Sequence, residues 1–233
     1  MKIAILGYGK MGRLVEAVAL REGCEIGPIL DLPGNAGGRE ITRERMSGVD
    51  VAIDFSQPEA VLPNIEAAAR AGLNLVVGTT GWQDQLARAE KAVHEGGIGL
   101  VHASNFSLGV NLFFEIAAHA AGLIGRLPAY DPYIVEEHHR AKKDAPSGTA
   151  LSLLEVMKPH LARLPQGIAS VRAGSLPGTH TVGFDSEADT IVLEHRARSR
   201  QGFAEGAVLA ARWIAGRRGL FNFREVFREI LAL

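Results

Sequence analysis

The chain begins with an apolar run that leads directly into a glycine-rich turn and then a helical segment. Residues 2–6 are almost wholly aliphatic, and the turn that follows them is Gly7-Tyr8-Gly9-Lys10-Met11-Gly12. Glycines at this spacing let the backbone turn tightly and approach a bound group closely. The free N–H groups at the start of the next helix, at 10–21, would face a phosphate. This order of strand, turn and helix predicts the first unit of a parallel α/β sheet.

The same alternation continues through the first half of the chain. The apolar runs do not alternate with polar residues, which is typical of strands that are buried on both faces of a parallel sheet. The sequence predicts further strands at 25–31, 49–54, 73–77 and 98–102, and helices at 58–71 and 84–95.

An acidic residue stands where a dinucleotide-binding sheet needs one. Asp31 ends the second predicted strand, 19 residues after Gly12. A carboxylate at that place accepts hydrogen bonds from an adenosine ribose. The alternative is a tight turn with an unrelated surface acid. With strand, turn, helix, strand and acid in order, we expect a Rossmann-type, doubly wound sheet that binds a dinucleotide.

Two later turns lie at the carboxyl ends of predicted strands, where open α/β sheets bind their ligands. One contains Gly78, Thr79 and Thr80, and the other runs Ala103-Ser104-Asn105-Phe106. Each turn alone is as well explained as an ordinary loop. Together they favour a cofactor cleft at this edge of the sheet.

After about Ser107 the pattern changes. The sequence predicts a long helix at 108–123, an extended segment of regular alternation at 130–143, a helix at 147–158, strands at 168–173, 180–184 and 190–197, and terminal helices at 203–215 and 224–231. We therefore predict a dinucleotide-binding domain formed by 1–107 with 203–233. Residues 108–202 would form a second, α+β domain for substrate binding and oligomerisation.

The segment richest in chemistry is Glu136-Glu137-His138-His139-Arg140-Ala141-Lys142-Lys143-Asp144-Ala145-Pro146-Ser147-Gly148-Thr149-Ala150. On an extended segment His138 and Lys142 share a face. Ser147 would cap a helix whose first N–H groups belong to Gly148 and Thr149. A histidine, a lysine and a helix N-terminus together form an anion site that can also supply protons.

Two other interpretations of this segment are open. Adjacent histidines are possible metal ligands, but on a strand their rings diverge and no third ligand stands at a familiar spacing, so we predict no metal. A solvated charged edge is the second interpretation. It does not explain why an organised helix cap follows the charges.

Composition excludes several classes of protein. With 25 Lys+Arg against 26 Asp+Glu, the net charge of −1 offers no field for nucleic acid or for an anionic membrane. No apolar run is long enough to span a bilayer, and no cleavage site follows the N-terminus. The single cysteine, Cys24, excludes an internal disulfide. We expect a cytoplasmic protein.

The stretch from His138 to Ala150 resembles the signature of the dihydrodipicolinate reductase family, also called 4-hydroxy-tetrahydrodipicolinate reductase. Other matching segments lie along nearly the whole chain: Asp54-Phe55-Ser56, Gly78-Thr79-Thr80-Gly81, 105–111, 177–182, 195–200 and 203–207. The resemblance implies NAD(P)H-dependent reduction of 4-hydroxy-tetrahydrodipicolinate, a small cyclic dicarboxylate, to tetrahydrodipicolinate with loss of water. This step belongs to lysine (diaminopimelate) biosynthesis, and the family enzyme is a homotetramer.

The resemblance also implies roles for single residues. His138 is similar to the catalytic acid/base of the family and Lys142 to its proton donor. His139, Gly148 and Thr149 correspond to substrate contacts. The NAD(P) site corresponds to Gly7, Tyr8, Gly9, Lys10, Met11, Gly12, Asp31, Gly78, Thr79, Thr80, Ala103, Ser104, Asn105 and Phe106.

The residue after Asp31 bears on the cofactor. Leu32 stands where some family members place a basic residue suited to a 2′-phosphate, so we expect NADH to be used at least as well as NADPH. Two rival functions remain: a related reductase of another amino or imino acid, and a non-catalytic regulator that senses NAD(H). The second usually needs a recognition helix or basic tail, and neither is present in the sequence.

Overall fold

The computed structural model describes all 233 residues, which divide into two compact units. The first unit comprises Met1–Ser107 with Arg200–Leu233, and the second comprises Leu108–Ser199. The sequence predicts the return to the first unit at 203. The chain returns at Arg200 because helix α6 (Gln201–Trp213) begins before its apolar periodicity becomes visible.

The first unit is built on a parallel sheet. Its six strands lie in the order β10-β5-β4-β3-β1-β2, and every pair is parallel. The strands are β1 (Lys2–Leu6), β2 (Glu25–Leu30), β3 (Val51–Asp54), β4 (Asn74–Val77), β5 (Gly99–His102) and β10 (Gly219–Asn222). The strand order reverses direction between β1 and β3, which places a ligand crevice at the carboxyl ends of these two strands.

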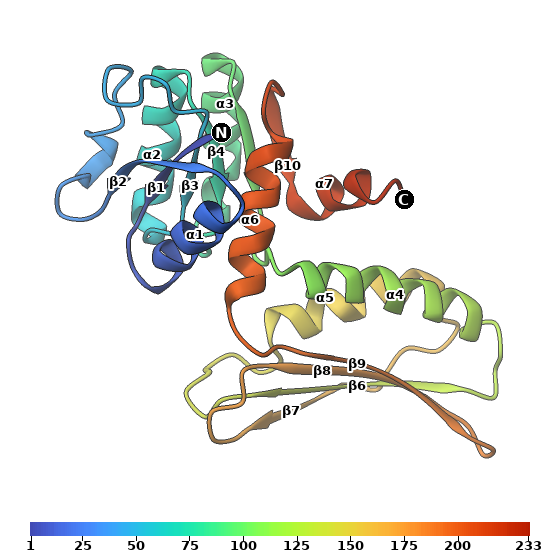
Figure 1. Cartoon of the computed structure of the whole chain (residues 1–233). Coiled ribbons are helices and arrows are strands. Elements are labelled where there is room, and N and C mark those ends of the chain that lie inside the picture. The colour runs from blue at the N-terminus through green and yellow to red at the C-terminus, as the bar shows by residue number, and fades with distance from the viewer. The chain divides into compact units, whose positions relative to one another are not determined.

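Helices cover both faces of this sheet (Figure 1). α2 (Pro58–Ala71) packs against α3 (Leu86–Gly96), and α1 (Lys10–Arg21) packs against α6. α2 begins with a proline at its first turn and ends at Gly72, which is left-handed with φ of 75°. The remaining helices of the unit are α7 (Phe223–Ile230) and the 3-10 turns η1 (Ala36–Gly38) and η2 (Gln83–Gln85).

The second unit is a mixed sheet with helices on one face. The strands lie in the order β7-β6-β8-β9; β6 and β7 are parallel, and the other pairs are antiparallel. They are β6 (Asp131–His138), β7 (Ile168–Arg172), β8 (Thr179–Asp185) and β9 (Thr190–Arg196). α4 (Leu108–Ile124) and α5 (Gly148–Met157), which is followed by the 3-10 turn η3 (Lys158–His160), lie on the same side, as Figure 1 shows.

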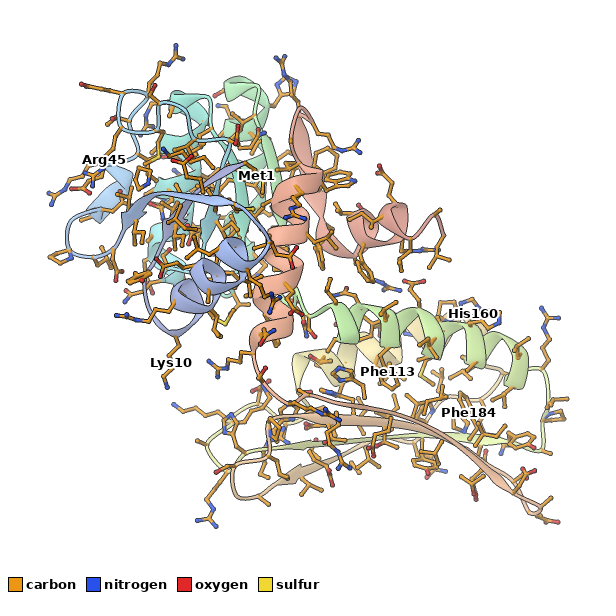
Figure 2. The ribbon with its side chains drawn as sticks, viewed as in Figure 1. Met1, Lys10, Arg45, Phe113, His160 and Phe184 are labelled. Atoms are coloured by element: carbon orange, nitrogen blue, oxygen red, sulfur yellow. The ribbon has the colours of Figure 1, made fainter.

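The core of the second unit fills the layer between these helices and the sheet. Phe113 of α4 and Phe184 of β8 both lie in this layer (Figure 2) and are buried in one cluster with Ile134 and Val182. The opposite face of the sheet carries no helix (Figure 1). A two-domain α/β protein with a doubly wound parallel sheet and a second α+β domain confirms the predicted fold class.

One predicted element has the wrong end, and one strand is missing from the prediction. The extended segment at 130–143 stops at His138, because a turn follows in which the Lys142 N–H donates to the His139 carbonyl at 3.1 Å. The edge strand β10 is absent from the predicted elements, since four half-exposed residues beside a helix carry little pattern.

No helix of the chain has both the length and the apolar character that a membrane crossing requires.

Candidate active site

The glycine turn between β1 and α1 has three glycines with three different surroundings. Gly7 has a φ of 85°, a left-handed conformation that favours glycine. A Cβ on Gly12 would lie 2.2 Å from the Gly7 carbonyl oxygen, so this position admits no side chain. A Cβ on Gly9 would meet nothing within 4 Å. The turn therefore closes on itself at Gly12 and stays open at Gly9, the N-cap of α1, where a phosphate is expected.

A pocket lies beside this turn and is lined in part by Asp31. Its other lining residues include Gly7, Gly9, Leu32, Asn35, Phe55, Ser56 and Asn64. β2 ends at Leu30, so Asp31 is the first residue after the strand and is exposed. Its Oδ1 accepts a hydrogen bond from the Leu32 N–H at 2.9 Å, and its other oxygen is available to a ribose. The glycine turn and Asp31 therefore line one pocket, at the place where the sequence predicts the adenosine ribose.

The remaining side chains of the turn are arranged around α1. Tyr8 donates a hydrogen bond to Glu16, and the Arg13 guanidinium lies 4.6 Å from the centre of the Tyr8 ring. Lys10 is exposed in the first turn of the helix, and Met11 is half-buried. The contacts with Glu16 and Arg13 hold the ring of Tyr8 against α1. Lys10 is exposed to solvent.

A buried polar network lies behind the pocket and was not predicted. The Asp54 carboxylate is fully buried and accepts hydrogen bonds from Ser56, Asn64 and Thr79. Burial raises the pKa of Asp54, and the hydrogen bonds from Ser56 and Asn64 oppose that rise. The Thr79 hydroxyl is therefore directed into this network, and its carbonyl accepts a hydrogen bond from the Trp82 indole at 2.9 Å. Thr80 is exposed beside it, and a Cβ on Gly78 would lie 2.1 Å from the Phe55 ring.

The turn after β5 also contains both exposed and buried residues. Ala103 is half-buried and Ser104 is exposed. Asn105 accepts a hydrogen bond from the Ser107 N–H at 2.8 Å. Phe106 is a core residue, with its ring centre 4.6 Å from that of Phe223. Any contact of Phe106 with a cofactor must come from its backbone.

In the second unit, His138 lies at the end of β6 and is held by a buried carboxylate. Glu136 is fully buried; one of its oxygens is hydrogen-bonded to His138 Nδ1, and the other accepts from Arg172 Nη2 at 2.5 Å. Burial would raise the pKa of Glu136, but hydrogen bonds from Arg172, Ser170 and His138 outweigh it and lower the pKa to about 2. Burial also lowers the pKa of His138, against the raising effect of Glu136. At pH 7 the pair is mainly a carboxylate and a neutral imidazole.

The loop between β6 and α5 carries Lys142. Lys142 Nζ lies 2.8 Å from Asp144 Oδ1, and the Asp144 carbonyl accepts from Arg172 Nη2 at 2.6 Å. Lys142 is close enough to His138 to lower the pKa of its imidazole. Arg172 therefore joins the carboxylate that holds His138 to the loop that carries Lys142. A turn, rather than the strand alternation that the sequence predicts, leads from one residue to the other.

The N-terminus of α5 is where the sequence predicts an anion site, and the structure places a capped and open helix end there. Ser147 is the N-cap, and its hydroxyl accepts from the Ala150 N–H at 3.2 Å. A Cβ on Gly148 would meet nothing within 4 Å, so the helix end is open there. Hydrogen bonds from Lys142 and from the Gly148 N–H hold the pKa of Asp144 below its usual range. The positive end of the helix dipole at this position favours a nearby negative charge. Thr149 follows Gly148 and is half-buried.

His180 of β8 joins the same cluster. Its Nε2 lies 3.2 Å from the Ser147 hydroxyl, and its ring meets the His138 ring edge-on with centres 5.2 Å apart. Burial and the neighbouring His138 lower the pKa of His180 to about 4. The imidazole is therefore neutral and links the cap of α5 to the end of β6.

This cluster corrects one step of the metal argument. Sequence spacing shows no third ligand for a histidine pair, yet the structure gathers Glu136, His138 and His180 with ligand atoms within 4.8 Å of one another. The Arg172 guanidinium binds the same carboxylate, and a fixed cation there opposes a second one. The set therefore fits a hydrogen-bonded proton network better than a metal centre.

Three residues of this site are absent from the predicted ones: Glu136, Arg172 and His180. Glu136 precedes His138 by two residues on the same strand, so alternation could have placed both side chains on one face. His180 and Arg172 come from other strands, and only the strand register brings them to His138: Arg172 is its partner on β7. His139 is half-buried beyond the end of β6, and its carbonyl begins the turn to Lys142.

Comparisons with known proteins agree along the whole chain. Residues 1–106 match the family model "Dihydrodipicolinate reductase, N-terminus", and residues 109–227 match "Dihydrodipicolinate reductase, C-terminus". The 4-hydroxy-tetrahydrodipicolinate reductase of Christiangramia forsetii is 36% identical, covering 99% of both chains. That of Cupriavidus necator is 38% identical, covering 97% of this chain and 98% of the relative.

A solved structure shows the same fold. It is a dipicolinate-bound dihydrodipicolinate reductase from Paenisporosarcina sp. TG-14, with a TM-score of 0.79 and 23% identity. The alignment covers 97% of this chain and 99% of that one. From the family matches and the relatives above 30% identity, the chain belongs to the dihydrodipicolinate reductase family and is a reductase.

Proposed function

We propose that this protein reduces 4-hydroxy-tetrahydrodipicolinate to tetrahydrodipicolinate with NAD(P)H, in lysine biosynthesis. In the net reaction the substrate takes one hydride from NAD(P)H and one proton, and its hydroxyl group leaves as water. The observation that carries the proposal is that Arg172 links the carboxylate bound to His138 with the loop of Lys142, beside the N-terminus of α5, in a chain of this family.

Substrate binding rests on the charge of two carboxylates. The N–H groups at Gly148 and Thr149 and the positive end of the α5 dipole attract one of them. His139 lies at the start of the same loop and supplies a further donor. A Cβ on Gly148 would meet nothing within 4 Å, so a substrate carboxylate has room to approach the helix end there.

Proton delivery rests on His138 and Lys142. The charge of Lys142 acts on His138. Its ammonium group can donate a proton to the reduced ring. His138 is mainly neutral at pH 7, with Nδ1 against Glu136, so Nε2 is the nitrogen that exchanges protons. A Cβ on Gly178 would lie 3.1 Å from that Nε2, so the glycine leaves room beside it.

The first unit fits a nicotinamide dinucleotide, which supplies the hydride when bound. Gly9 and the N-terminus of α1 receive the pyrophosphate, and Asp31 receives the ribose diol. The turns at Gly78–Thr80 and 103–106 lie at the carboxyl ends of β4 and β5, where the nicotinamide half is expected.

The direct test is oxidation of NADH and NADPH with freshly generated 4-hydroxy-tetrahydrodipicolinate. A substrate-dependent loss of the absorbance of the reduced cofactor, at a rate typical of an enzyme, supports the proposal. A folded protein that gives no such loss overturns it. A panel of other cyclic imines and imino acids tests the rival reductase, since faster turnover of one of these would replace the proposed substrate. A DNA-binding assay at physiological salt tests the rival regulator.

We expect NADH to be used at least as well as NADPH. Asp31 accepts hydrogen bonds from a ribose diol but repels a 2′-phosphate, by on the order of 1 kcal/mol, or about five- to tenfold in affinity. Leu32 brings no charge, and the Arg39 guanidinium donates to the carbonyls of Gly34 and Pro33 at 2.6 and 3.3 Å. Steady-state kinetics with both cofactors measure the ratio. A tenfold advantage of NADPH would show that Lys10 or Arg39 reaches the phosphate instead.

We also propose that four copies associate through the uncovered face of the second sheet. Strand alternation places Tyr133, Val171 and Val192 on that face, with exposed fractions of 36%, 40% and 52%. Tyr133 lies over Gly183, where a Cβ would come within 2.0 Å of its ring. An exposed apolar sheet face of this kind is typical of a surface that is buried in an assembly.

Val192→Asp is therefore expected to break the tetramer. A carboxylate on the apolar face would be buried near its symmetry copies, which costs more than the lost apolar contact. Light scattering after size exclusion measures the mass. Leu123→Asp is the matched control, because Leu123 is a 62% exposed side chain on α4, on the other side of the unit. A Val192→Asp protein that stays tetrameric would place the interface elsewhere.

A cytoplasmic location completes the proposal. The reaction consumes a diffusible nicotinamide cofactor, and the cytoplasm supplies it. Cys24 is buried and free, which suits a reducing compartment. Fractionation of cells that express the protein tests this location, and recovery of the activity in another fraction would contradict it.

A further inference from the structure

Glu136 is a buried charge whose two ion-pair partners, His138 and Arg172, both belong to the candidate active site. It lies on β6 with no exposed surface, on the side of the sheet that faces α4 and α5. An ionised carboxylate in such a place costs several kcal/mol unless it is paired and hydrogen-bonded. The pairing comes from Arg172 on one oxygen and from His138 on the other. A position that serves only packing would not need an ion there.

Arg172 joins this carboxylate to the loop that carries Lys142. One nitrogen, Nη2, donates to Glu136 Oε1 at 2.5 Å and to the Asp144 carbonyl at 2.6 Å, while Nη1 donates to the Val171 carbonyl at 2.8 Å. Arg172 is the cross-strand partner of His138 in the pairing of β6 with β7. The guanidinium thus holds the end of the strand and the loop in one geometry.

From these contacts we propose that Glu136, held by Arg172, is a positioning residue that fixes His138 in the tautomer with its proton on Nδ1 and leaves Nε2 for the reaction. The inference rests on the proposed function, since it assigns how the acid/base group of that reaction is set. Arg172 also holds the loop of Lys142, so the two proton-transferring groups share one support.

The tautomer follows from the hydrogen bond. A carboxylate can only accept, so Nδ1 must carry the hydrogen. The other tautomer would place a nitrogen lone pair against an anion. A Gln at position 136 offers an amide N–H₂ as well as a carbonyl, so it admits both tautomers. An orienting carboxylate changed to its amide is known to spoil a catalytic histidine in this way while leaving its geometry intact.

Three charged groups act on the titration of His138, and one neutral ring packs against it. Glu136 on β6 raises its pKa, whereas Lys142 in the loop and Arg172 on β7 lower it. His180 on β8 packs edge-on against the ring and is neutral at pH 7. Removing Glu136 should therefore lower the pKa of His138, and removing the charge of Arg172 should raise it. The opposite signs distinguish positioning from general damage.

The experiment compares Glu136→Gln and Arg172→Gln with the unaltered enzyme. For Glu136→Gln we expect kcat to fall by about 10- to 100-fold, with the KM for NADH unchanged. In ¹⁵N NMR spectra, the His138 signals, assigned by their loss in His138→Gln, should change from one tautomer to a mixture. The pKa of His138 should fall in Glu136→Gln and rise in Arg172→Gln.

Three controls make the outcome decisive. Glu137→Gln removes a carboxylate from the next residue of β6, on the other face, and should leave the tautomer and kcat unchanged. Arg172→Lys keeps the positive charge, so the pKa of His138 in this variant should stay near that of the unaltered enzyme. If either single variant fails to fold, the double variant Glu136→Gln with Arg172→Gln removes both buried charges, and the tautomer is measured there.

The outcomes separate this inference from the proposed function. Failure of the unaltered protein to reduce 4-hydroxy-tetrahydrodipicolinate overturns the function, whatever the NMR spectra show. An active protein whose His138 keeps one tautomer and an unmoved pKa in Glu136→Gln overturns the positioning role alone. An equal fall in activity with unmoved signals would mean that Glu136 has a structural role only.

Discussion

His138→Gln and Lys142→Ala should each lower kcat by about 10²–10⁴-fold, the usual cost of losing an acid–base group. His138 lies at the end of β6 and Lys142 in the loop that follows it, and Arg172 links that loop to the carboxylate that holds His138. Neither residue belongs to the first unit, which carries the proposed dinucleotide site. The Kd for NADH should therefore be unchanged when it is measured by fluorescence titration.

His139→Ala is the matched comparison for these two variants. The residue is adjacent in sequence, but its predicted part is a substrate contact made before and during the reaction. Its loss should mainly raise the KM for substrate and leave kcat within a few-fold. Near-normal kcat in both His138→Gln and Lys142→Ala would remove the proton-transfer assignment. Weaker NADH binding in those variants would show that the two sites are wrongly divided between the units.

The first unit could be predicted from sequence nearly to the residue, because its signals are local. The glycine turn, the apolar runs and the proline at the start of α2 each act on their own few residues. The strand β1 and the helices α1 and α2 have the predicted bounds. The edge strand β10 is short and half-exposed, so tertiary pairing with β5 rather than pattern creates it.

The candidate site could be predicted only in part, because its support comes from distant strands. His138, Lys142, Ser147 and Gly148 lie in one continuous segment, and the motif identified them. Arg172 and His180 reach His138 through the register of β7 and β8, which local pattern does not specify. The turn after His138 was also hidden, since its residues continue the alternation of the strand. Long-range pairing therefore decides which groups surround the reacting histidine.

Gly12→Ala should destabilise the protein, and Gly9→Ala should not. A Cβ on Gly12 would lie 2.2 Å from a backbone oxygen, and such overpacking costs about 3 kcal/mol. Alanine gains up to about 1 kcal/mol in helix propensity, which does not offset this clash. The Tm should therefore fall by about 5–10 °C. At Gly9 nothing lies within 4 Å and φ is −80°, which alanine adopts, so the Tm should stay within about 2 °C.

Cofactor binding should respond to both changes, and Gly9→Ala is the cleaner probe. If a pyrophosphate approaches the backbone at Gly9, the added methyl group holds it away from the helix N–H groups. A loss of about 1.4 kcal/mol there would raise the Kd for NADH tenfold. Thermal unfolding and NADH titration of both variants give the comparison, with Gly167→Ala as a control outside the turn, because a Cβ there would meet nothing within 4 Å. An unchanged Kd in a stable Gly9→Ala protein would mean that the phosphates bind elsewhere, because the open position at the start of α1 would then be unoccupied by the cofactor.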